Sequence, residues 1–335
     1  MKKIILKLIA AFIPTLILFF TNLYFNVSVI EKASDNALNG KISYLFGNYN
    51  DRQVVRRIIE KRETIHETII FGSSSEKEIT AEVTGYEDQA NFCLSSGYLA
   101  DYIGILGLYK KLAKGFPKRI ILSPRPWDFV KDGRVSYLSQ GFVFKDTFAC
   151  FYDKTGGERY RLVLEKIKGT VKENLSTTTL FAKNYAHKIY ERKEDSPRPD
   201  LVSTRYPDGH IGYSEKHDKE STEAKPRRSE FSYVPESFPQ KMSDYFTDIK
   251  NFCAENGIEL VIFLAPVSQI CVDNFDGASQ GITIADCEDH ARKLAGDCLV
   301  RGTYSPDPLN FTNKDFYDDK HLKREHLKQV WDYIR

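Results

Sequence analysis

Two short segments near opposite ends of the chain hold the side chains needed for covalent acyl chemistry. Gly72-Ser73-Ser74-Ser75-Glu76 follows an apolar run, and Asp318-Asp319-Lys320-His321 lies near the carboxyl terminus. Together they supply a hydroxyl nucleophile in Ser74, an imidazole base in His321, and a carboxylate in Asp318 that can hold the base in one tautomer. The two segments predict a Ser-His-Asp site if the fold brings them together.

The turn around Ser74 has the features of a strand-to-helix junction. Glycine lets the chain turn sharply after a strand, so that the following side chains and amides are presented above the sheet edge. Ser73 and Glu76 have capping-box spacing, which favours a helix start at this point. We expect the Ser74 amide at this start to stabilise a developing anion. The alternative is that these serines only cap a helix.

Apolar patterns along the chain predict an α/β fold. Runs with little polar alternation indicate buried strands at 68–71, 90–94, 119–123 and 259–265. Apolar residues at helical spacing indicate helices at 54–59, 98–114, 242–253 and 321–335. Strands of this kind separated by amphipathic helices are typical of a three-layer sandwich with a central, mainly parallel sheet.

Composition limits the classes of partner. The chain has 335 residues, 41% of them hydrophobic, which suffices for one large α/β domain plus a tether. Forty-eight Lys and Arg nearly balance 46 Asp and Glu, giving a formal net charge of +2. Without a basic stripe, nucleic acid is not an expected partner.

The amino terminus has the length and composition of a membrane anchor. Residues 8–30 are apolar with few interruptions, long enough to cross a hydrocarbon core. A cleaved signal peptide is the main alternative, but its apolar region is normally shorter and ends at an Ala-x-Ala-like site. Lys2, Lys3 and Lys7 precede the segment, so the positive-inside rule places the amino terminus in the cytoplasm and the body outside it.

These patterns divide the chain into three parts. We expect a membrane anchor at 1–32, a membrane-proximal helical linker at 33–65, and an α/β domain at 66–335. The domain is interrupted at about 158–236 by an insertion that is helical over 158–189 and polar over 191–236. The polar part is interpreted as a solvated loop, with a lid or substrate-binding flap as the alternative.

No pattern in the chain indicates a metal or cofactor. The six cysteines contain no Cys-x-x-Cys pair. Cys93 and Cys253 fall inside apolar patterns and are expected to pack as small hydrophobes. A disulfide among the last three cysteines is the alternative to free thiols if the compartment is oxidising. His210 and His217 lack spaced partner ligands, so we expect them to be solvated.

The two chemical segments resemble those of the SGNH/GDSL hydrolase superfamily, in which Gly-Asp-Ser follows the first strand and Asp-x-x-His precedes the last helix. Gly72-Ser73-Ser74 matches the first block with Ser in place of Asp, and Asp318-Asp319-Lys320-His321 matches the last. The wider run Phe316 to Leu322 is similar to that of membrane-anchored relatives, the D-alanyl transfer protein of lipoteichoic acid and the alginate O-acetylation proteins. Those relatives act with a membrane-bound O-acyltransferase on cell-envelope polymers.

The intermediate blocks of the superfamily match less well. Gly97 stands where the second block places an oxyanion-hole amide, so the resemblance implies a hole made by Ser74 and Gly97. The third block normally carries Gly-x-Asn-Asp, but this chain has Leu122-Ser123-Pro124-Arg125-Pro126-Trp127-Asp128. Arg125 and Asn91 are kept as candidate substrate contacts, with a structural Arg125–Asp128 pair as the alternative.

These features predict a membrane-anchored serine esterase or O-acyltransferase acting outside the cytoplasm. An acyl donor would load Ser74, and water or a hydroxyl of a cell-envelope glycan or other polymer would accept the acyl group. The resemblance implies a membrane-bound O-acyltransferase as a partner. The alternative is a catalytically silent module of the same fold that binds glycan or the acyltransferase.

Overall fold

The computed structural model describes residues 2–45, 50–130, 141–175, 203–212, 234–279 and 281–335. Its centre is a five-stranded sheet in the order β3-β2-β4-β7-β8, with every neighbouring pair parallel. These strands are β2 (Thr68–Phe71), β3 (Gln89–Asn91), β4 (Arg119–Leu122), β7 (Glu259–Leu264) and β8 (Leu299–Gly302). The α/β class with a parallel sheet, predicted from the apolar runs, is therefore confirmed.

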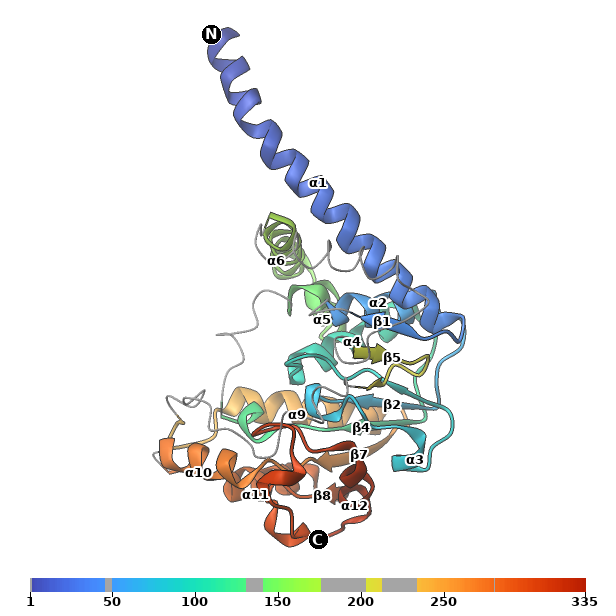
Figure 1. Cartoon of the computed structure of the whole chain (residues 1–335), viewed down its shortest axis with the longest axis vertical. Coiled ribbons are helices and arrows are strands. Elements are labelled where there is room, and N and C mark those ends of the chain that lie inside the picture. Colours follow the sequence, from blue (N-terminus) through green and yellow to red (C-terminus); the bar gives the residue numbers. More distant parts are fainter. Residues whose placement is uncertain (1, 46–49, 131–140, 176–202, 213–233, 280) are drawn as a thin grey trace.

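Helices cover both faces of this sheet (Figure 1). One face packs against α2 (Asp51–Lys61), α4 (Leu99–Leu112), α9 (Gln240–Glu255), α10 (Gln269–Ala278) and α11 (Ile284–Ala295). The other packs against α3 (Ala81–Thr84) and α12 (Leu327–Asp332).

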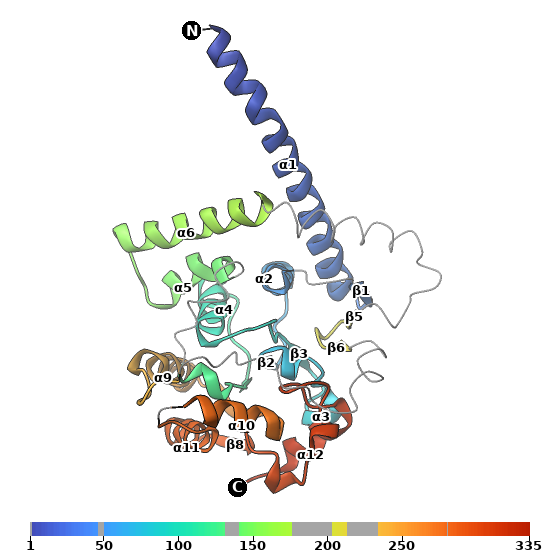
Figure 2. The same ribbon diagram turned by 60° about the vertical axis from the view of Figure 1, so that its left-hand side comes forward.

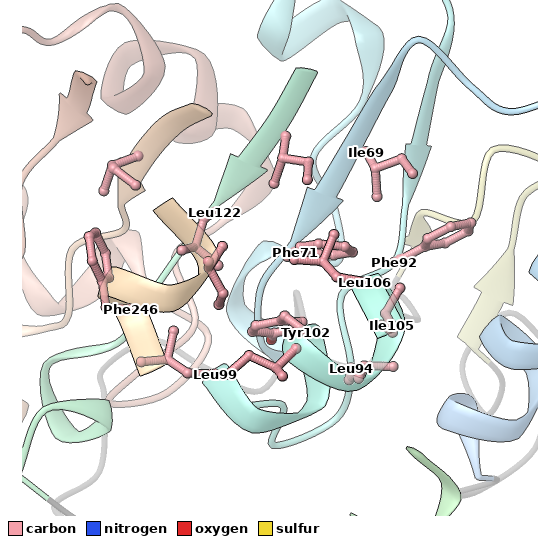
Figure 3. Close-up of a cluster of buried hydrophobic side chains, with 14 of the residues drawn as sticks. Ile69, Phe71, Phe92, Leu94, Leu99, Tyr102, Ile105, Leu106, Leu122 and Phe246 are labelled. Atoms are coloured by element: carbon pink, nitrogen blue, oxygen red, sulfur yellow. The ribbon is translucent and has the colours of Figure 1, made fainter. Parts of the chain in front are cut away.

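The side chains of β2 alternate between these two cores, as the pleat of a strand requires. Ile69 and Phe71 belong to the first core and Ile70 to the second. Figure 3 shows the first core, where Phe71 stacks on Tyr102 of α4 with ring centroids 5.1 Å apart.

The amino-terminal helix α1 (Lys2–Leu38) projects from the body as a long rod (Figure 1). Among the described residues it is the one helix long and apolar enough to cross a membrane. Side chains such as Phe12 and Phe20 are exposed, whereas Asn22 and Ile30 are buried against the body. The segment 8–30, expected to lie wholly in a membrane, is thus partly covered by protein.

Residues 33–65, expected as a linker, contribute to the main core. Ala33 and Ala37 near the end of α1 share this core with Val55 and Ile59 of α2. Arg57 also pairs with Glu31 at 2.5 Å. The end of α1 is therefore packed and ion-paired onto the domain.

A second, antiparallel sheet joins β1 (Ser43–Leu45), β5 (Ser203–Arg205) and β6 (Ile211–Gly212). The β5–β6 hairpin belongs to the polar stretch that was interpreted as a solvated loop. It is packed instead, because the Ile211 amide donates to the Lys77 carbonyl at 2.8 Å and the Asn91 amide donates to the Asp208 carbonyl at 2.7 Å. The rest of that stretch, except 234–236, lies outside the described residues.

Several of the remaining helices and strands differ in their bounds from the prediction or were not predicted from the sequence. The helix expected at 158–189 is α6 (Gly156–Leu175), and 176–189 lie outside the described residues. The helix expected from His321 begins only at Leu327, because Phe316 and Leu322 form an antiparallel bridge that holds His321 in a turn. Helices α10 and α11 and strand β8 were not predicted. The other short elements are α5 (Lys145–Phe151) and the 3-10 turns η1 (Ser74–Glu76), η2 (Pro126–Asp128), η3 (Gly141–Phe144), η4 (Asp307–Leu309), η5 (Asn313–Asp315) and η6 (Arg324–His326).

Candidate active site

Gly72 and a capping box build the turn that carries Ser74. A Cβ atom on Gly72 would lie 2.7 Å from Glu76 Oε2 and 2.9 Å from Cys93 Sγ, so only glycine fits at this approach. The Ser73 amide donates to Glu76 Oε2 at 2.5 Å, and Ser73 Oγ accepts from the Ser75 amide at 3.3 Å. The predicted capping box is therefore present and places Ser74 first in η1.

The second segment is a tight turn that fixes Asp318 next to His321. The Tyr317 amide donates to the His321 carbonyl at 2.8 Å and closes the turn. Inside it, Asp318 Oδ1 accepts from the amides of Lys320 at 2.9 Å and of His321 at 3.0 Å. The carboxylate is thus held by backbone amides before it contacts the imidazole.

Ser74, His321 and Asp318 form one hydrogen-bonded chain. His321 Nε2 lies 2.8 Å from Ser74 Oγ, and His321 Nδ1 lies 2.8 and 2.9 Å from the two oxygens of Asp318. A carboxylate only accepts, so in the neutral imidazole Nδ1 carries the proton and Nε2 is the acceptor facing the hydroxyl. This tautomer is the one that lets an imidazole act as a general base toward serine.

The charge on Asp318 is well stabilised. Burial by itself raises the pKa of a carboxyl group, but the hydrogen bond and charge of His321 and the two turn amides outweigh burial here. The pKa of Asp318 therefore lies well below its usual range, and the group remains a carboxylate at any physiological pH.

Direct contacts tie the two segments to each other and to the sheet. Ser75 Oγ donates to the Lys320 carbonyl at 3.2 Å. The Asp319 carbonyl accepts from the amide and the hydroxyl of Ser268, at 3.2 and 3.0 Å, just beyond the end of β7. The triad is consequently held by backbone contacts on two strand ends as well as by its own hydrogen bonds.

Gly97 does not supply the expected second oxyanion donor in this conformation. Its amide donates to the Leu94 carbonyl at 2.8 Å and closes a turn. A Cβ on Gly97 would lie 2.5 Å from the Tyr102 hydroxyl, so the residue is needed for packing. Its role in the structure is a tight turn beside the Ser74 segment.

Asn91, expected as a substrate contact, is a buried structural brace. Its Nδ2 lies 2.9, 3.3 and 3.1 Å from the carbonyls of Glu76, Lys77 and Ile79, and its Oδ1 accepts from the Cys93 amide at 3.0 Å. The side chain is 1% exposed. It therefore satisfies the carbonyls that follow η1 and is not placed to bind substrate.

Arg125 forms the structural pair that was the alternative to substrate binding. Its Nη2 lies 2.6 Å from Asp128 Oδ1, and its amide donates to Asp128 Oδ2 at 3.0 Å. Burial lowers the pKa of the guanidinium, but Asp128 more than offsets this, so the Arg125 pKa lies above its usual range. Burial raises the pKa of the Glu76 carboxyl above its usual value, and the positive charge of Arg125 offsets part of this rise.

A buried cluster of charges, missed from the sequence, holds the serine turn against α2 and α4. Lys77 Nζ donates to Asp51 Oδ2 at 2.8 Å and to Ser95 Oγ at 2.6 Å. Beside it, Arg52 binds Asp101 with two hydrogen bonds of 3.0 and 2.8 Å. A signal was available, because Asp51 and Arg52 continue the apolar stripe of α2 and so had to face the core.

The charge of Asp51 in this cluster is stabilised despite its burial. Burial raises the pKa of Asp51, but Lys77, Arg52 and the Ser95 amide outweigh it and leave the pKa below its usual value. Each charge in the cluster therefore has an opposite charge beside it, and the pair with Asp51 holds Lys77, the residue that follows η1, against α2.

A polar cavity of about 470 Å³ is lined by the β5–β6 hairpin and by residues that flank the two triad segments in the chain, but not by Ser74, His321 or Asp318. Tyr317 stands directly before Asp318, and Lys323 and Arg324 closely follow His321. The lining is completed by Glu78, Thr204, Tyr206, Gly212 and Glu325. Aromatic rings and charges of both signs suit a hydroxyl-rich ligand.

His210 and His290 make contacts away from the triad. His210, expected to be solvated, stacks on Tyr206 with ring centroids 4.1 Å apart and bonds Asp208 at 2.6 Å, while His217 lies outside the described residues. His290 forms a second Ser-His hydrogen bond, 2.8 Å from Ser243 Oγ, with its ring stacked on Phe238.

All six cysteines are free thiols, so the optional disulfide among the last three does not form. Cys93 and Cys253 are buried as predicted, and burial raises the pKa of Cys253 to about 12. In the part of the chain that the structure describes, no cluster of His, Cys, Asp and Glu has the geometry of a metal site.

Comparison with known proteins adds no assignment. No protein-family model matches the chain, and no curated protein is significantly similar to it in sequence.

Proposed function

We propose that this chain is a membrane-tethered serine acyl enzyme of the SGNH/GDSL type, acting outside the cytoplasm. The observation that carries the proposal is the hydrogen-bonded chain Ser74–His321–Asp318, with spacings of 2.8 Å at each His321 nitrogen. Two segments that resemble the first and last superfamily blocks are the ones that meet in space.

The sheet order supports this family. Numbered along the chain, the five strands run 2-1-3-4-5, the flavodoxin-like doubly wound order, and the reversal falls between β2 and β4. Ligands of such sheets bind at the carboxyl ends of the strands beside this reversal. Ser74 follows the carboxyl end of β2, which is where an SGNH-type nucleophile belongs.

The chemistry proceeds in two balanced steps. Ser74 Oγ attacks the carbonyl carbon of an ester or thioester while His321 Nε2 takes the hydroxyl proton, and Asp318 stabilises the resulting imidazolium. The leaving alkoxide or thiolate receives that proton as the C–O or C–S bond breaks, which leaves acyl-Ser74. A hydroxyl of water or of an acceptor then attacks the acyl carbon and gives its proton to His321; the bond from that carbon to Ser74 Oγ breaks, and His321 returns the proton to Oγ, which regenerates Ser74.

Transfer to a polymer is favoured over hydrolysis. With the Gly97 amide engaged and no third-block asparagine, two expected oxyanion donors are missing, and one such donor contributes about 3 kcal/mol to transition-state stabilisation. Hydrolysis of a small ester should therefore be slow. The polar cavity lined by the β5–β6 hairpin and by residues flanking the triad segments offers a place for a hydroxyl-rich acceptor such as a cell-envelope glycan. A membrane-bound O-acyltransferase is the partner that we propose as acyl source.

The engaged Gly97 amide also favours a second candidate function. A catalytically silent module of this fold that binds glycan or an acyltransferase needs no oxyanion hole. It predicts glycan binding that Ser74→Ala leaves unchanged, together with no ester turnover.

Trapping of the acyl intermediate separates these candidates. The full chain in detergent micelles is incubated with a small acetyl ester, and peptide mass spectrometry should find one acetyl group on Ser74 that is absent in His321→Ala. Ser243→Ala is the matched control, since it removes the other Ser-His hydrogen bond and should leave acetylation intact. A wild-type chain that never becomes acetylated would refute the enzyme and favour the binding module.

A further inference from the structure

Helix α6 (Gly156–Leu175) carries an exposed apolar stripe. Tyr160, Ile167, Val171 and Leu175 are 65, 53, 40 and 38% exposed. Their spacings of seven, four and four residues place them on one face of the helix. Exposed apolar residues scattered singly need no explanation, but a continuous helical face indicates a surface that is covered by something.

Contacts on the opposite face fix the direction of this stripe. Leu162 is buried, and a Cβ on Gly169 would lie 2.2 Å from the Phe142 ring, so this side of α6 packs closely on the body. Lys166 pairs with Asp146 of α5 at 3.2 Å. Since these contacts orient α6, its apolar stripe faces away from the domain.

The end of α6 is joined to α1 at a defined level. Asn22 Nδ2 donates to the Asn174 carbonyl at 3.0 Å, and both side chains are buried at this contact. In both views α6 lies at the end of the body from which α1 projects, and Figure 2 shows it running sideways from α1. Of the exposed apolar residues of α1, Phe12, Ile13, Leu16, Ile17 and Phe20 precede Asn22 along the helix, and Tyr24 and Val27 follow it.

The length of α1 before this contact matches a bilayer. Residues 4–21, in which Lys7 near the cytoplasmic end is the one charged residue, are 18 positions, which in an α-helix extend about 27 Å. The hydrocarbon core of a membrane is about 30 Å thick. Asn22, and with it α6, therefore lies at the level where α1 would leave the hydrocarbon.

Charge along α6 fits the same boundary. Arg161, Lys168 and Lys172 are exposed and lie along one flank of the apolar stripe. An apolar face bordered by Lys and Arg is typical of helices that lie in the membrane interface, where the basic residues meet anionic lipid headgroups.

We propose that α6 lies in the plane of the membrane interface, with its apolar face in the lipid and its opposite face carrying the domain. The inference rests on the proposed anchoring by α1. With two non-parallel helices in contact with the bilayer, the domain is held at a defined orientation and does not swing on a single tether. The triad thereby keeps a constant height above the membrane.

Tryptophan quenching in vesicles tests this placement. The full chain is reconstituted in phosphatidylcholine vesicles, with and without phosphatidylglycerol, that contain lipid brominated at the first acyl carbons. Ile167→Trp and Val171→Trp each add one tryptophan on the stripe, and the wild-type signal of Trp127 and Trp331 is subtracted. Ile334→Trp is the matched control, because Ile334 is 58% exposed beside the carboxyl terminus, far from α6 in Figure 2.

We expect blue-shifted, quenched emission at 167 and 171, stronger with phosphatidylglycerol, and none at 334. Flotation of the vesicles reports the α1 anchor independently, and acetylation of Ser74 reports the proposed chemistry independently. Vesicles that carry the chain without quenching at 167 and 171 would overturn the in-plane helix and point to a protein partner on that face. A chain that does not float with the vesicles would overturn both the anchor and the in-plane helix.

Discussion

Ser74 Oγ and His321 Nε2 lie 2.8 Å apart although 247 positions separate them in the chain. The contact exists because β2 delivers Ser74 to the carboxyl end of the sheet and the 316–322 turn is bound to the ends of β2 and β7. No local segment could hold this geometry alone, because its supports come from parts of the chain that are far apart in sequence.

Replacing Asp318 by Asn should disable the base while leaving the fold intact. With the side-chain oxygen held by the Lys320 and His321 amides, the Asn Nδ2 faces His321 Nδ1 and donates to it, so the imidazole carries its proton on Nε2, and kcat should fall by about 10⁴-fold while the chain still folds. Steady-state ester or transfer kinetics measure this. Asp88→Asn is the control, since Asp88 pairs with His66 at 2.6 Å away from the site and its loss should not affect kcat.

Asp318 should also give stability a distinctive pH dependence. Its pKa is lower in the folded chain than the ordinary value of about 3.9, so its stabilising contribution is complete above that value and is lost as the pH falls through the folded pKa. The difference in melting temperature between wild type and Asp318→Asn should be constant from pH 8 to about pH 5 and shrink in more acidic buffer. A difference that grows on acidification would contradict the low pKa.

Lys77→Met should be strongly destabilising. It leaves Asp51 buried with Arg52 3.7 Å away as its remaining cationic neighbour, and breaking a buried pair by removing one partner costs about 3–5 kcal/mol. Urea unfolding of the wild type and of Lys77→Met measures the loss in the free energy of unfolding. Lys118→Met removes the exposed pair with Glu67 and should cost less than about 1 kcal/mol. Equal losses in the two variants would show that the buried cluster does not support the turn.

Gly72→Ala should damage both stability and activity. The added methyl group meets the Glu76 carboxylate and Cys93 Sγ, so the serine turn has to shift, at a cost of about 1–3 kcal/mol, and acylation of Ser74 should slow. Thermal unfolding and acetyl transfer are measured together. Gly157→Ala meets nothing within 4 Å, and it should leave activity unchanged and stabilise α6 by up to about 1 kcal/mol.

Tyr206→Ala should separate polymer use from small-ester use. If the cavity lined by the hairpin and by Tyr317 holds the acceptor, loss of one aromatic contact should raise KM for a glycan acceptor by about tenfold and leave acetylation of Ser74 by a small ester unchanged. Ile334→Ala removes an exposed apolar side chain beside the carboxyl terminus, which does not line the cavity, and serves as control. A parallel loss of both activities in Tyr206→Ala would instead indicate a structural role for the hairpin.

Local sequence patterns were sufficient to predict those parts of the structure that depend on contacts between neighbours in the chain. Strand β2 has the predicted bounds, Thr68–Phe71, because an uninterrupted apolar run has only the buried sheet to occupy. The capping box of Ser73 and Glu76 and the turn that joins Asp318 to His321 each link residues three positions apart, so their spacing alone determines the hydrogen bonds.

Roles that depend on distant partners were decided only by the tertiary structure. By their positions in the sequence, Gly97 and Asn91 look like site residues. In the structure, however, the Gly97 amide donates to the Leu94 carbonyl. The Asn91 side chain donates to the backbone carbonyls of Glu76, Lys77 and Ile79. Burial of Lys77 against Asp51 likewise follows from how α2 docks on the sheet. Sequence therefore determined which chemical groups the chain possesses and which local turns hold them, whereas packing between remote segments decided which groups face each other, because hydrogen bonds and burial depend on distance in space.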